Sequence, residues 1–276
     1  MLKKFIVNKN YHNSRFDRWF KQNVSNVPQS LIEKFIRKKK VKINNKRVKT
    51  SYRVQLNDVV ELYGVGELKP NNKSKKEKYK PSEKEKGEYG KLIIENNDNF
   101  IVINKPSGIP VQSGTKSFKN IIDILKNTKY FEHTKPFVVH RLDKETSGVM
   151  IVAKNREYAQ LFTSLFRIRK IHKTYLAITH GAVEKDISLL QDNLSIYEKN
   201  KKVIQKAISY LKILKSNNEY SFLELKPITG RKHQLRKQLF NIGNPIVGDD
   251  KYPVLGEKIK IKTKNIMLHA HKIKFM

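Results

Sequence analysis

The sequence predicts an α+β protein with a small N-terminal domain and a larger C-terminal domain. The first observation is a break in composition, because residues 64–91 contain almost no apolar side chains and many Lys, Glu, Pro and Gly residues. The second is that strand-like alternation outnumbers helical periodicity after this break, and most links have hairpin length. We therefore expect domains at 1–63 and 92–276, joined by a flexible basic linker at 64–91. The larger domain should contain a mixed, largely antiparallel sheet flanked by helices.

The composition points to a polyanionic partner. The 276-residue chain carries 58 Lys and Arg residues against 25 Asp and Glu residues, a formal net charge of +33, and nucleic acid is the first candidate. The chain has no cysteine, which excludes disulfides and thiolate chemistry. It also lacks a signal-peptide core and any apolar run of about 18 residues. We expect a cytoplasmic protein that does not enter a membrane.

Two helices are predicted in the N-terminal domain. Segments 14–23 and 28–40 place apolar residues three and four positions apart, as amphipathic helices do. Ser30 is a candidate N-cap of the second helix, with Glu33 as its capping-box partner. Two stretches within 41–63 then alternate like short strands, so we expect a small sheet after the helices.

Basic residues gather at the end of the second predicted helix and along the hairpin that follows. Most charge runs only form a solvated face, but this much positive charge in one compact place is suited to binding phosphates. The candidates for RNA binding in this domain are Arg37, Lys38, Lys40 and Arg47.

From Arg15 to about Leu62, the N-terminal domain resembles the ribosomal-protein-S-four-like RNA-binding domain. The resemblance rests on RFDRWF, on the predicted helix with IRKKKVKIN, and on NDVVEL. Lys39 and Asn57 stand where this family usually has glycine. Both can be tolerated, since asparagine accepts left-handed backbone conformations.

The C-terminal domain alternates strands with a few helices. A Lys-Pro-Ser-Gly turn ends the first strand, a polar turn separates two further strands, and Gly243 stops the last helix. The predicted strands are 100–103, 137–140, 149–153, 174–179 and 220–227, and the predicted helices are 119–127, 157–166 and 232–243.

The polar turn RLDKETSG, residues 141–148, holds the strongest candidate for chemistry. An aspartate in such a turn is most often structural. However, Arg141 lies two residues before Asp143, and a second basic cluster, TGRKHQLRKQ, contributes Arg231 and Arg236. An arginine beside a carboxylate keeps it ionised, and an ionised, oriented carboxylate can act as a nucleophile or a base. No second carboxylate has a comparable setting, which weakens a paired-acid hydrolysis scheme.

Other chemistries lack their motifs. There is no GxxxxGK[ST] phosphate loop, no GxGxxG and no HExxH. His269 and His271 form the closest histidine pair, a pattern more typical of packing than of a metal site. Ser107 and Ser147 lack the GxSxG context of a serine hydrolase. We expect no metal site.

The segment HRLDKETSGVMIVAKN resembles the signature of the RluA/RluC type of large-subunit rRNA pseudouridine synthases. Four further segments support the resemblance in order: NFIVINKPSGIPVQSG, RKIHKTYLAITHG, ITGRKHQLRKQLFNIGNPIVGDDKY and MLHAHKIKF. Together they cover residues 98–275, and with the N-terminal domain the architecture is similar to the RluC branch. The resemblance implies an isomerase that needs no cofactor or metal: it breaks the uracil–ribose bond of a chosen uridine in 23S rRNA and rejoins the base through a ring carbon.

The resemblance also implies roles for single residues. Asp143 is essential, either attacking the sugar or removing a proton from it. Tyr175 stacks on the target base and assists the late removal of a proton from the ring. Arg236 pairs with Asp143, and Arg141 helps to fill the space that the flipped base leaves. Further candidates for RNA binding are Arg231, His233 and Gln234.

Two alternatives stay open at this point. One is the same reaction on tRNA, and the other is a non-catalytic RNA-binding or ribosome-assembly factor that retains the fold. A binding-only descendant has no reason to keep Arg141, Asp143, Tyr175 and Arg236 together, which favours an enzyme. We expect an RNA partner, most simply 23S rRNA or its precursor, and a monomeric protein.

Overall fold

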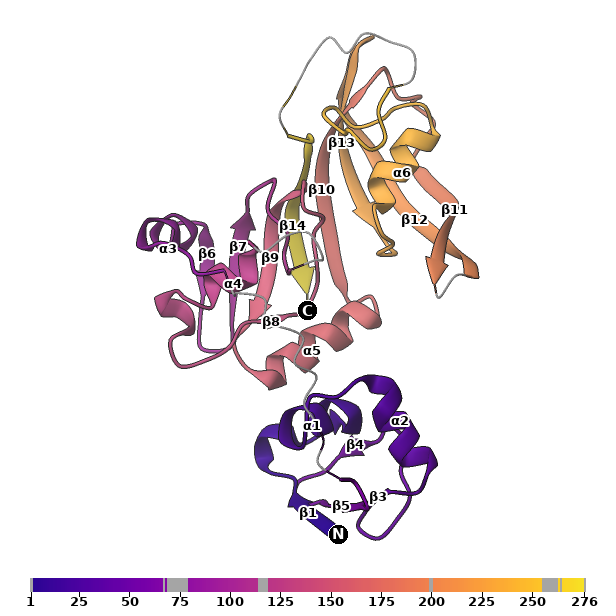
Figure 1. Ribbon diagram of the computed structural model, residues 1–276. Helices are drawn as coiled ribbons and strands as arrows, with labels where there is room; N and C mark the ends of the chain where they lie inside the picture. Colours follow the sequence, from indigo (N-terminus) through magenta and orange to yellow (C-terminus); the bar gives the residue numbers. More distant parts are fainter. Residues whose placement is uncertain are drawn as a thin grey trace. The chain divides into compact units, whose positions relative to one another are not determined.

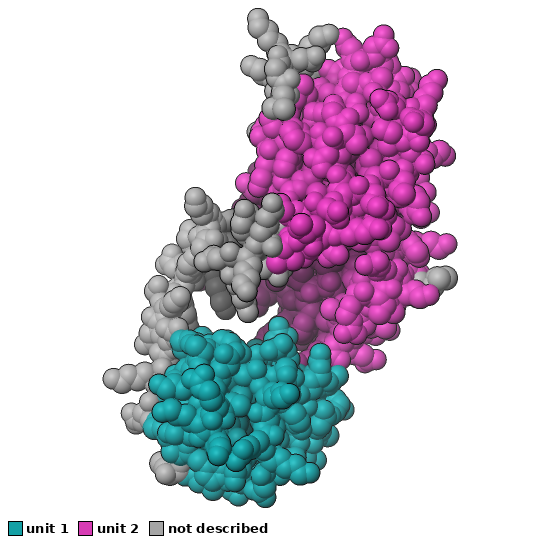
Figure 2. All heavy atoms as spheres, turned by 90° about the vertical axis from the view of Figure 1, so that its right-hand side faces the viewer, with its two compact units in different colours: residues 1–77 teal, residues 78–276 magenta. Residues whose placement is uncertain are grey.

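The chain forms two compact units, residues 1–77 and 78–276 (Figure 2). The computed structural model describes residues 2–66, 68, 79–113, 119–198, 201–254, 263 and 265–275. No helix within these residues is both long and apolar enough to cross a membrane.

The first unit contains both predicted helices, α1 (Phe16–Asn23) and α2 (Gln29–Arg37). The N-cap prediction is wrong: α2 follows Pro28 without a side-chain cap, so Ser30 lies inside the first turn. The helices cover a three-stranded sheet in the order β1–β5–β3, and a two-stranded sheet lies beside it (Figure 1). The strands of the first unit are β1 (Leu2–Ile6), β2 (Ser14–Arg15), β3 (Val41–Ile43), β4 (Arg53–Val54) and β5 (Val59–Tyr63), with a 3-10 turn at Lys9–Tyr11.

Aromatic packing holds the first unit together. Phe16, Trp19 and Phe20 are at most 1% exposed and stack or meet edge-on within 6.0 Å. The backbone at Lys39 and Asn57, where glycine is usual, has φ angles of 59° and 65°. Both residues therefore adopt a left-handed conformation, which glycine accommodates most easily.

Part of the predicted linker is folded. Helix α3 (Glu83–Gly90) begins with a capping box, in which Ser82 Oγ accepts from the Glu85 N–H and the Glu85 carboxylate accepts from the Ser82 N–H. Tyr79 and Tyr89 pack against a buried cluster of the second unit. The prediction of a flexible linker therefore does not hold for residues 79–91, because two aromatic side chains dock a helix that is otherwise strongly polar. Residues 69–78 lie outside the described part of the chain.

Nine described strands of the second unit form one sheet, in the order β11–β12–β13–β10–β14–β9–β7–β6 with β8 paired to β9 (Figure 1). All described pairs are antiparallel except β14 with β9, which confirms the predicted mixed sheet. The strands are β6 (Ile93–Asn96), β7 (Phe100–Lys105), β8 (Phe137–Val138), β9 (Ser147–Ala153), β10 (Ile171–His180), β11 (Leu189–Glu198), β12 (Lys201–Ser216), β13 (Tyr220–Pro227) and β14 (Leu268–Phe275).

Helices cover both faces of this sheet. Successive residues of β9 alternate between two cores: Met150 joins the cluster under α4 (Ile121–Leu125), and Ile151 joins the cluster under α5 (Arg156–Arg167). Helix α6 (Gln234–Asn241) packs on β10 and β13 through Leu235 and Leu239. A short 3-10 helix spans Lys129–Phe131.

The parallel contact between β14 and β9 allows only glycine at one position. Gly148 has a φ of 112°, and a Cβ atom there would lie 2.2 Å from the carbonyl oxygen of Ala270 and 2.6 Å from its nitrogen. Neither atom can rotate away, because both belong to the backbone. The residues immediately before Gly148 are those of the polar turn, so this close approach fixes where the turn ends.

We expect Gly148→Ala to destabilise the protein by about 3 kcal/mol or more, because both the φ angle and the contact with Ala270 are unfavourable for a side chain. Gly243→Ala is the matched control. Gly243 has a φ of 82°, but nothing lies within 4 Å of the added Cβ, so we expect a loss of stability of about 1 to 2 kcal/mol. Chemical denaturation of both variants measures the difference. Equal losses would show that the close approach contributes nothing beyond the backbone angle.

Candidate active site

A cleft of about 710 Å³ brings together all the predicted site residues of the second unit. Its walls are the polar turn before β9, the strand β10, the end of β13, the start of α6 and the end of α5. The predicted residues that line it are Arg141, Asp143, Tyr175, Arg231, His233, Gln234 and Arg236. Residues that are far apart in the sequence therefore converge on one concave surface.

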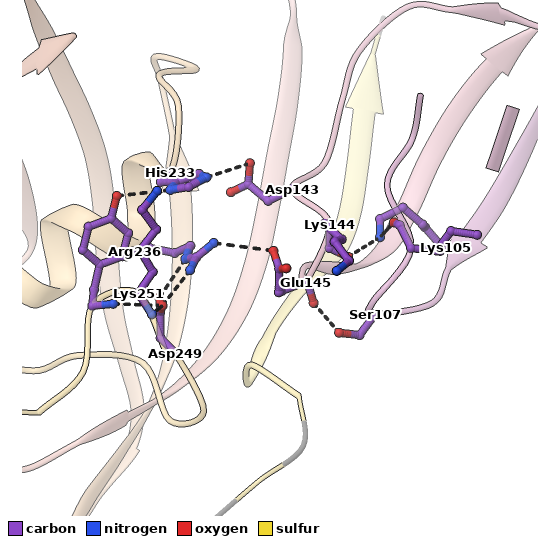
Figure 3. A network of polar contacts seen from close by, with 11 residues as sticks. Lys105, Ser107, Asp143, Lys144, Glu145, His233, Arg236, Asp249 and Lys251 are labelled. Atoms are coloured by element: carbon purple, nitrogen blue, oxygen red, sulfur yellow. Dashed lines mark hydrogen bonds and ion pairs between the residues drawn. The ribbon is translucent and has the colours of Figure 1, made fainter. Parts of the chain in front are cut away.

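Asp143 lies on the turn between β8 and β9, and its side chain is 31% exposed. The Lys-Pro-Ser-Gly segment after β7 holds this turn by its backbone. Ser107 Oγ donates to the carbonyl oxygen of Glu145 at 2.5 Å (Figure 3). The Gly108 N–H donates to the carbonyl oxygen of Lys144 at 3.0 Å. The turn is thus fixed while the Asp143 carboxylate remains accessible.

Lys105 also binds the backbone of this turn. Its side chain is 0% exposed, and Nζ donates to the carbonyl oxygens of Pro106 at 2.8 Å, Ile109 at 2.8 Å and Lys144 at 3.0 Å. Burial lowers the pKa of Lys105 to about 8, although the nearby Glu145 and Asp143 oppose the shift. It is therefore still an ammonium at neutral pH, and all three of its N–H donors are used. Sequence reasoning treated Lys105 only as part of a turn; a lysine at the end of an apolar strand was the available signal.

Arg236 binds a carboxylate other than the predicted one. Its guanidinium forms a bidentate pair with Asp249, with Nε–Oδ2 at 2.7 Å and Nη2–Oδ1 at 2.6 Å. Nη1 lies 3.9 Å from Glu145 Oε2 (Figure 3). The prediction that Arg236 pairs with Asp143 is therefore wrong in this structure. The physical reason is that the Asp249 side chain is 0% exposed, and a buried carboxylate must be paired.

The charge of Arg236 still reaches the polar turn. Burial opposes the charged form, but the hydrogen bonds and charge of Asp249, together with Asp143 and Glu145, raise the pKa of Arg236. Arg236 thus stays charged and links the loop that contains Asp249 to the turn that contains Asp143. The partner Asp249 was missed by sequence reasoning, which used the segment GNPIVGDDKY for the family resemblance but named none of its carboxylates.

Tyr175 enters the cleft from the sheet. It pairs with Leu225 on β13 and Ala270 on β14, beside a register shift between Thr174 and Tyr175. Burial, with a smaller contribution from the charge of Asp143, raises the pKa of Tyr175. Its side chain therefore remains a neutral phenol at any physiological pH.

His140 is a third residue that sequence reasoning missed. Its Nε2 accepts a hydrogen bond from the Ile151 N–H at 3.0 Å, and its ring lies 4.6 Å from that of Phe166. Burial, with Lys173 adding to the effect, lowers the pKa of His140 to about 3. The ring is neutral, with its hydrogen on Nδ1. Its position directly before Arg141 in the motif was the signal that could have identified it.

The predicted RNA-binding residues differ in their surroundings. In the second unit, Arg141 is exposed, and Arg231 donates from Nε to the carbonyl oxygen of Lys206 at 3.1 Å. In the first unit, Lys40 donates to the carbonyl oxygen of Gly64 at 2.7 Å. The exposed candidates of that unit are Arg37, Lys38 and Arg47. Within the described residues, no group of three or more His, Asp or Glu side chains could hold a metal ion.

Comparison with known proteins gives concordant matches for both units. The family described as RNA pseudouridylate synthase matches residues 99–241, and the S4 domain matches residues 26–60. The ribosomal large subunit pseudouridine synthase C of Rickettsia felis is 34% identical, over 94% of this chain and 88% of the relative. The protein of the same name from Buchnera aphidicola subsp. Baizongia pistaciae is 31% identical, over 98% of this chain and 88% of the relative.

Two solved structures share the fold of the second unit. Human RNA pseudouridylate synthase domain containing 4 has a TM-score of 0.58 and 29% identity, and the match covers 69% of this chain and 86% of that chain. Human RNA pseudouridylate synthase domain containing 1 has a TM-score of 0.56, over 66% of this chain and 76% of that chain. At 24% identity, the second match supports the fold alone.

The neutral state of His140 predicts a pH-dependent stability. Its folded pKa lies below the unfolded value of about 6.5, so protonation of the unfolded chain removes stability as the pH falls from about 6.5 towards 3. From about pH 8 to pH 5, the free energy of unfolding of wild type should fall by about 1 to 2 kcal/mol more than that of His140→Gln. The glutamine can still accept the Ile151 N–H but does not titrate. Denaturant unfolding at both pH values measures this. Equal losses in the two proteins would contradict it.

Proposed function

Because the chain belongs to the RNA pseudouridylate synthase family, we propose that it converts a uridine of large-subunit rRNA into pseudouridine. The chain is then an isomerase: the bond between the ring nitrogen and the ribose breaks, and a bond from a ring carbon to the same sugar replaces it. A proton leaves that carbon and the nitrogen gains one, so no atom is lost overall. The names of the relatives that match nearly the whole chain support the choice of large-subunit rRNA.

The observation that carries the proposal is the cleft in which Asp143, Tyr175 and Arg236 meet. A uridine inside an RNA fold must leave its stack before its sugar can be reached, at a cost of a few kcal/mol. A concave site with an aromatic ring and several arginines can recover this cost through stacking and contacts with phosphates. We assign the flipped uridine to this cleft.

Each residue has a separate part in the proposed reaction. Asp143 is the essential carboxylate, acting on the sugar as a nucleophile or as a base. Tyr175 meets the base as a neutral phenol, which suits stacking and hydrogen bonding. Arg236 supplies positive charge beside the turn that contains Asp143, while its guanidinium keeps both hydrogen bonds to Asp249. Arg141 and Arg231 hold the RNA at the rim.

The first unit is proposed to bind RNA and to raise the concentration of the second unit near its target. Its match to the S4 domain and the exposed Arg37, Lys38 and Arg47 support this. Phosphate contacts of this kind fix position and carry little sequence information. A cytoplasmic location and a monomeric state remain predictions from the sequence alone.

Asp143→Asn should abolish pseudouridine formation and leave the dissociation constant for RNA within about threefold of wild type, because the amide keeps the shape but cannot attack or accept a proton. Carbodiimide mapping of protein-free large-subunit rRNA, with tRNA in parallel, measures the product. The matched control is Asp250→Asn, which neutralises an exposed carboxylate next to Asp249 and should leave turnover unchanged.

The outcomes of this experiment separate the alternatives. If wild type produces the reverse-transcription stop that marks pseudouridine only in tRNA, the substrate is tRNA and not rRNA. No stop in either RNA would favour a non-catalytic RNA-binding or ribosome-assembly factor. Loss of RNA binding by Asp143→Asn would count against the assigned role of the carboxylate.

Replacing Arg37, Lys38 and Arg47 together by Gln should weaken RNA binding and reduce the slope of log K against log salt by about 2 to 3, if each contacts one phosphate. The single-turnover rate at saturating RNA should not change, since the cleft is untouched. Filter binding from low to moderate salt measures the slope. The control variant neutralises three cations of the same unit outside this cluster: Lys9, Arg18 and Lys21. An equal effect of the control would mean that only the total charge matters.

A further inference from the structure

We propose that His233 is a positioning residue for the reaction: its Nε2–H orients the Asp143 carboxylate, and Tyr252 and Asp249 hold His233 in that arrangement. The inference rests on the proposed function, because it assigns a task at the same site. His233 would then serve the chemical step rather than grip the RNA.

His233 is placed to contact the carboxylate. Its Nε2 lies 3.8 Å from Asp143 Oδ1 (Figure 3). Among the described residues, it is the one cationic or imidazole side chain whose nitrogen comes within 4.0 Å of an Asp143 oxygen. The distance is longer than a hydrogen bond, and a sub-ångström movement would close it.

The second ring nitrogen decides where the imidazole hydrogen lies. His233 Nδ1 is 3.1 Å from the hydroxyl oxygen of Tyr252, and the two rings meet edge-on at 5.9 Å. Burial raises the pKa of Tyr252, so the phenol keeps its hydrogen and can donate it to Nδ1. A neutral imidazole that accepts at Nδ1 carries its own hydrogen on Nε2, the atom that faces Asp143.

The charges around His233 favour this neutral form. Burial lowers the pKa of His233, and Arg236, Lys251 and Lys232 lower it further, while Asp143 opposes them. At neutral pH the ring therefore offers Asp143 an N–H donor without a full positive charge. Such a donor can orient the carboxylate and still leave it reactive.

One buried carboxylate supports the whole arrangement. Asp249 Oδ1 accepts from the backbone N–H groups of Lys251 at 3.0 Å and Tyr252 at 3.1 Å, while both oxygens bind Arg236. The guanidinium of Arg236 also lies over the ring of Tyr252, at 5.3 Å from its centre. Asp249 therefore places the phenol that fixes the ring of His233.

The backbone of His233 gives independent support. It has φ 53° and ψ 32°, a left-handed conformation, and it occupies the N-cap position of α6 without making a side-chain cap. A Ser, Asp or Asn residue would start the helix better. The next residue, Gln234, is held by its side chain: Oε1 accepts from Thr229 Oγ1 at 2.7 Å and from the Arg231 N–H at 3.0 Å. Strain that neighbours over-determine in this way is typical of functional sites.

Two substitutions of His233 test whether the reaction depends on the length of its side chain or on its left-handed backbone. His233→Asn tolerates the left-handed conformation, but its amide reaches only as far as the Nδ1 position. His233→Gln places an amide N–H near the Nε2 position and can still donate to Asp143. We expect His233→Asn to lower the single-turnover rate at saturating RNA by about 10- to 100-fold and His233→Gln to restore it to within about fivefold of wild type. Tyr252→Phe should give an intermediate loss, because the tautomer is no longer fixed.

The readouts distinguish this proposal from its competitors. The dissociation constant for RNA should stay within about threefold of wild type in all three variants, since the step affected follows binding. Equal rates for His233→Asn and His233→Gln, or a loss confined to the dissociation constant, would overturn the positioning role. If wild type itself forms no pseudouridine, the proposed function fails. If wild type is active and His233→Asn matches it, only the present inference fails.

Discussion

The buried ion pair between Arg236 and Asp249 is the interaction on which the rest of the site depends. In a low-dielectric interior each partner needs the other, because removing one leaves an uncompensated charge. The pair joins helix α6 to the loop that follows it, and the same carboxylate binds the backbone of residues 251 and 252. Arg236, His233 and Tyr252 therefore keep their places without contacts from substrate. The wall that they form is set before RNA arrives, which is the condition for electrostatic preorganisation.

The opposite wall is fixed by different means. There the polar turn is tied by its backbone, through the buried ammonium of Lys105 and the close approach at Gly148. No described side chain lies at hydrogen-bond distance from the Asp143 carboxylate. The backbone of the turn therefore sets the position of this carboxylate. A rigid turn with an accessible carboxylate faces a rigid wall of donors and positive charge, and the space between them can admit a sugar and its base.

Local patterns predicted every described α-helix except α3, because apolar periodicity reports which face is buried. Among the strands, β1, β6, β11 and β12 were not predicted. Helix α3 was missed since its sequence is polar, and its docking depends on Tyr79, Tyr89 and the ion pair of Glu85 with Lys119. Asp143 and Arg236 could be assigned to one site from their motifs, but their pairing could not: the choice of Asp249 depends on burial and on distances that no spacing encodes. The roles of Lys105 and His140 were hidden for the same reason, as each depends on a hydrogen bond to the backbone of another segment.

The position of β14 in the sheet has a consequence for how the protein folds. This strand lies between β10 and β9 and supplies the only described pairing between the two halves of the sheet. One of its contacts joins Ser147 to His269, which are 122 residues apart. Closing a loop of that length costs entropy that local contacts cannot offset early, so the halves should form first and join late. The two walls of the cleft belong to different halves, so the cleft should be completed only in the last long-range step of folding.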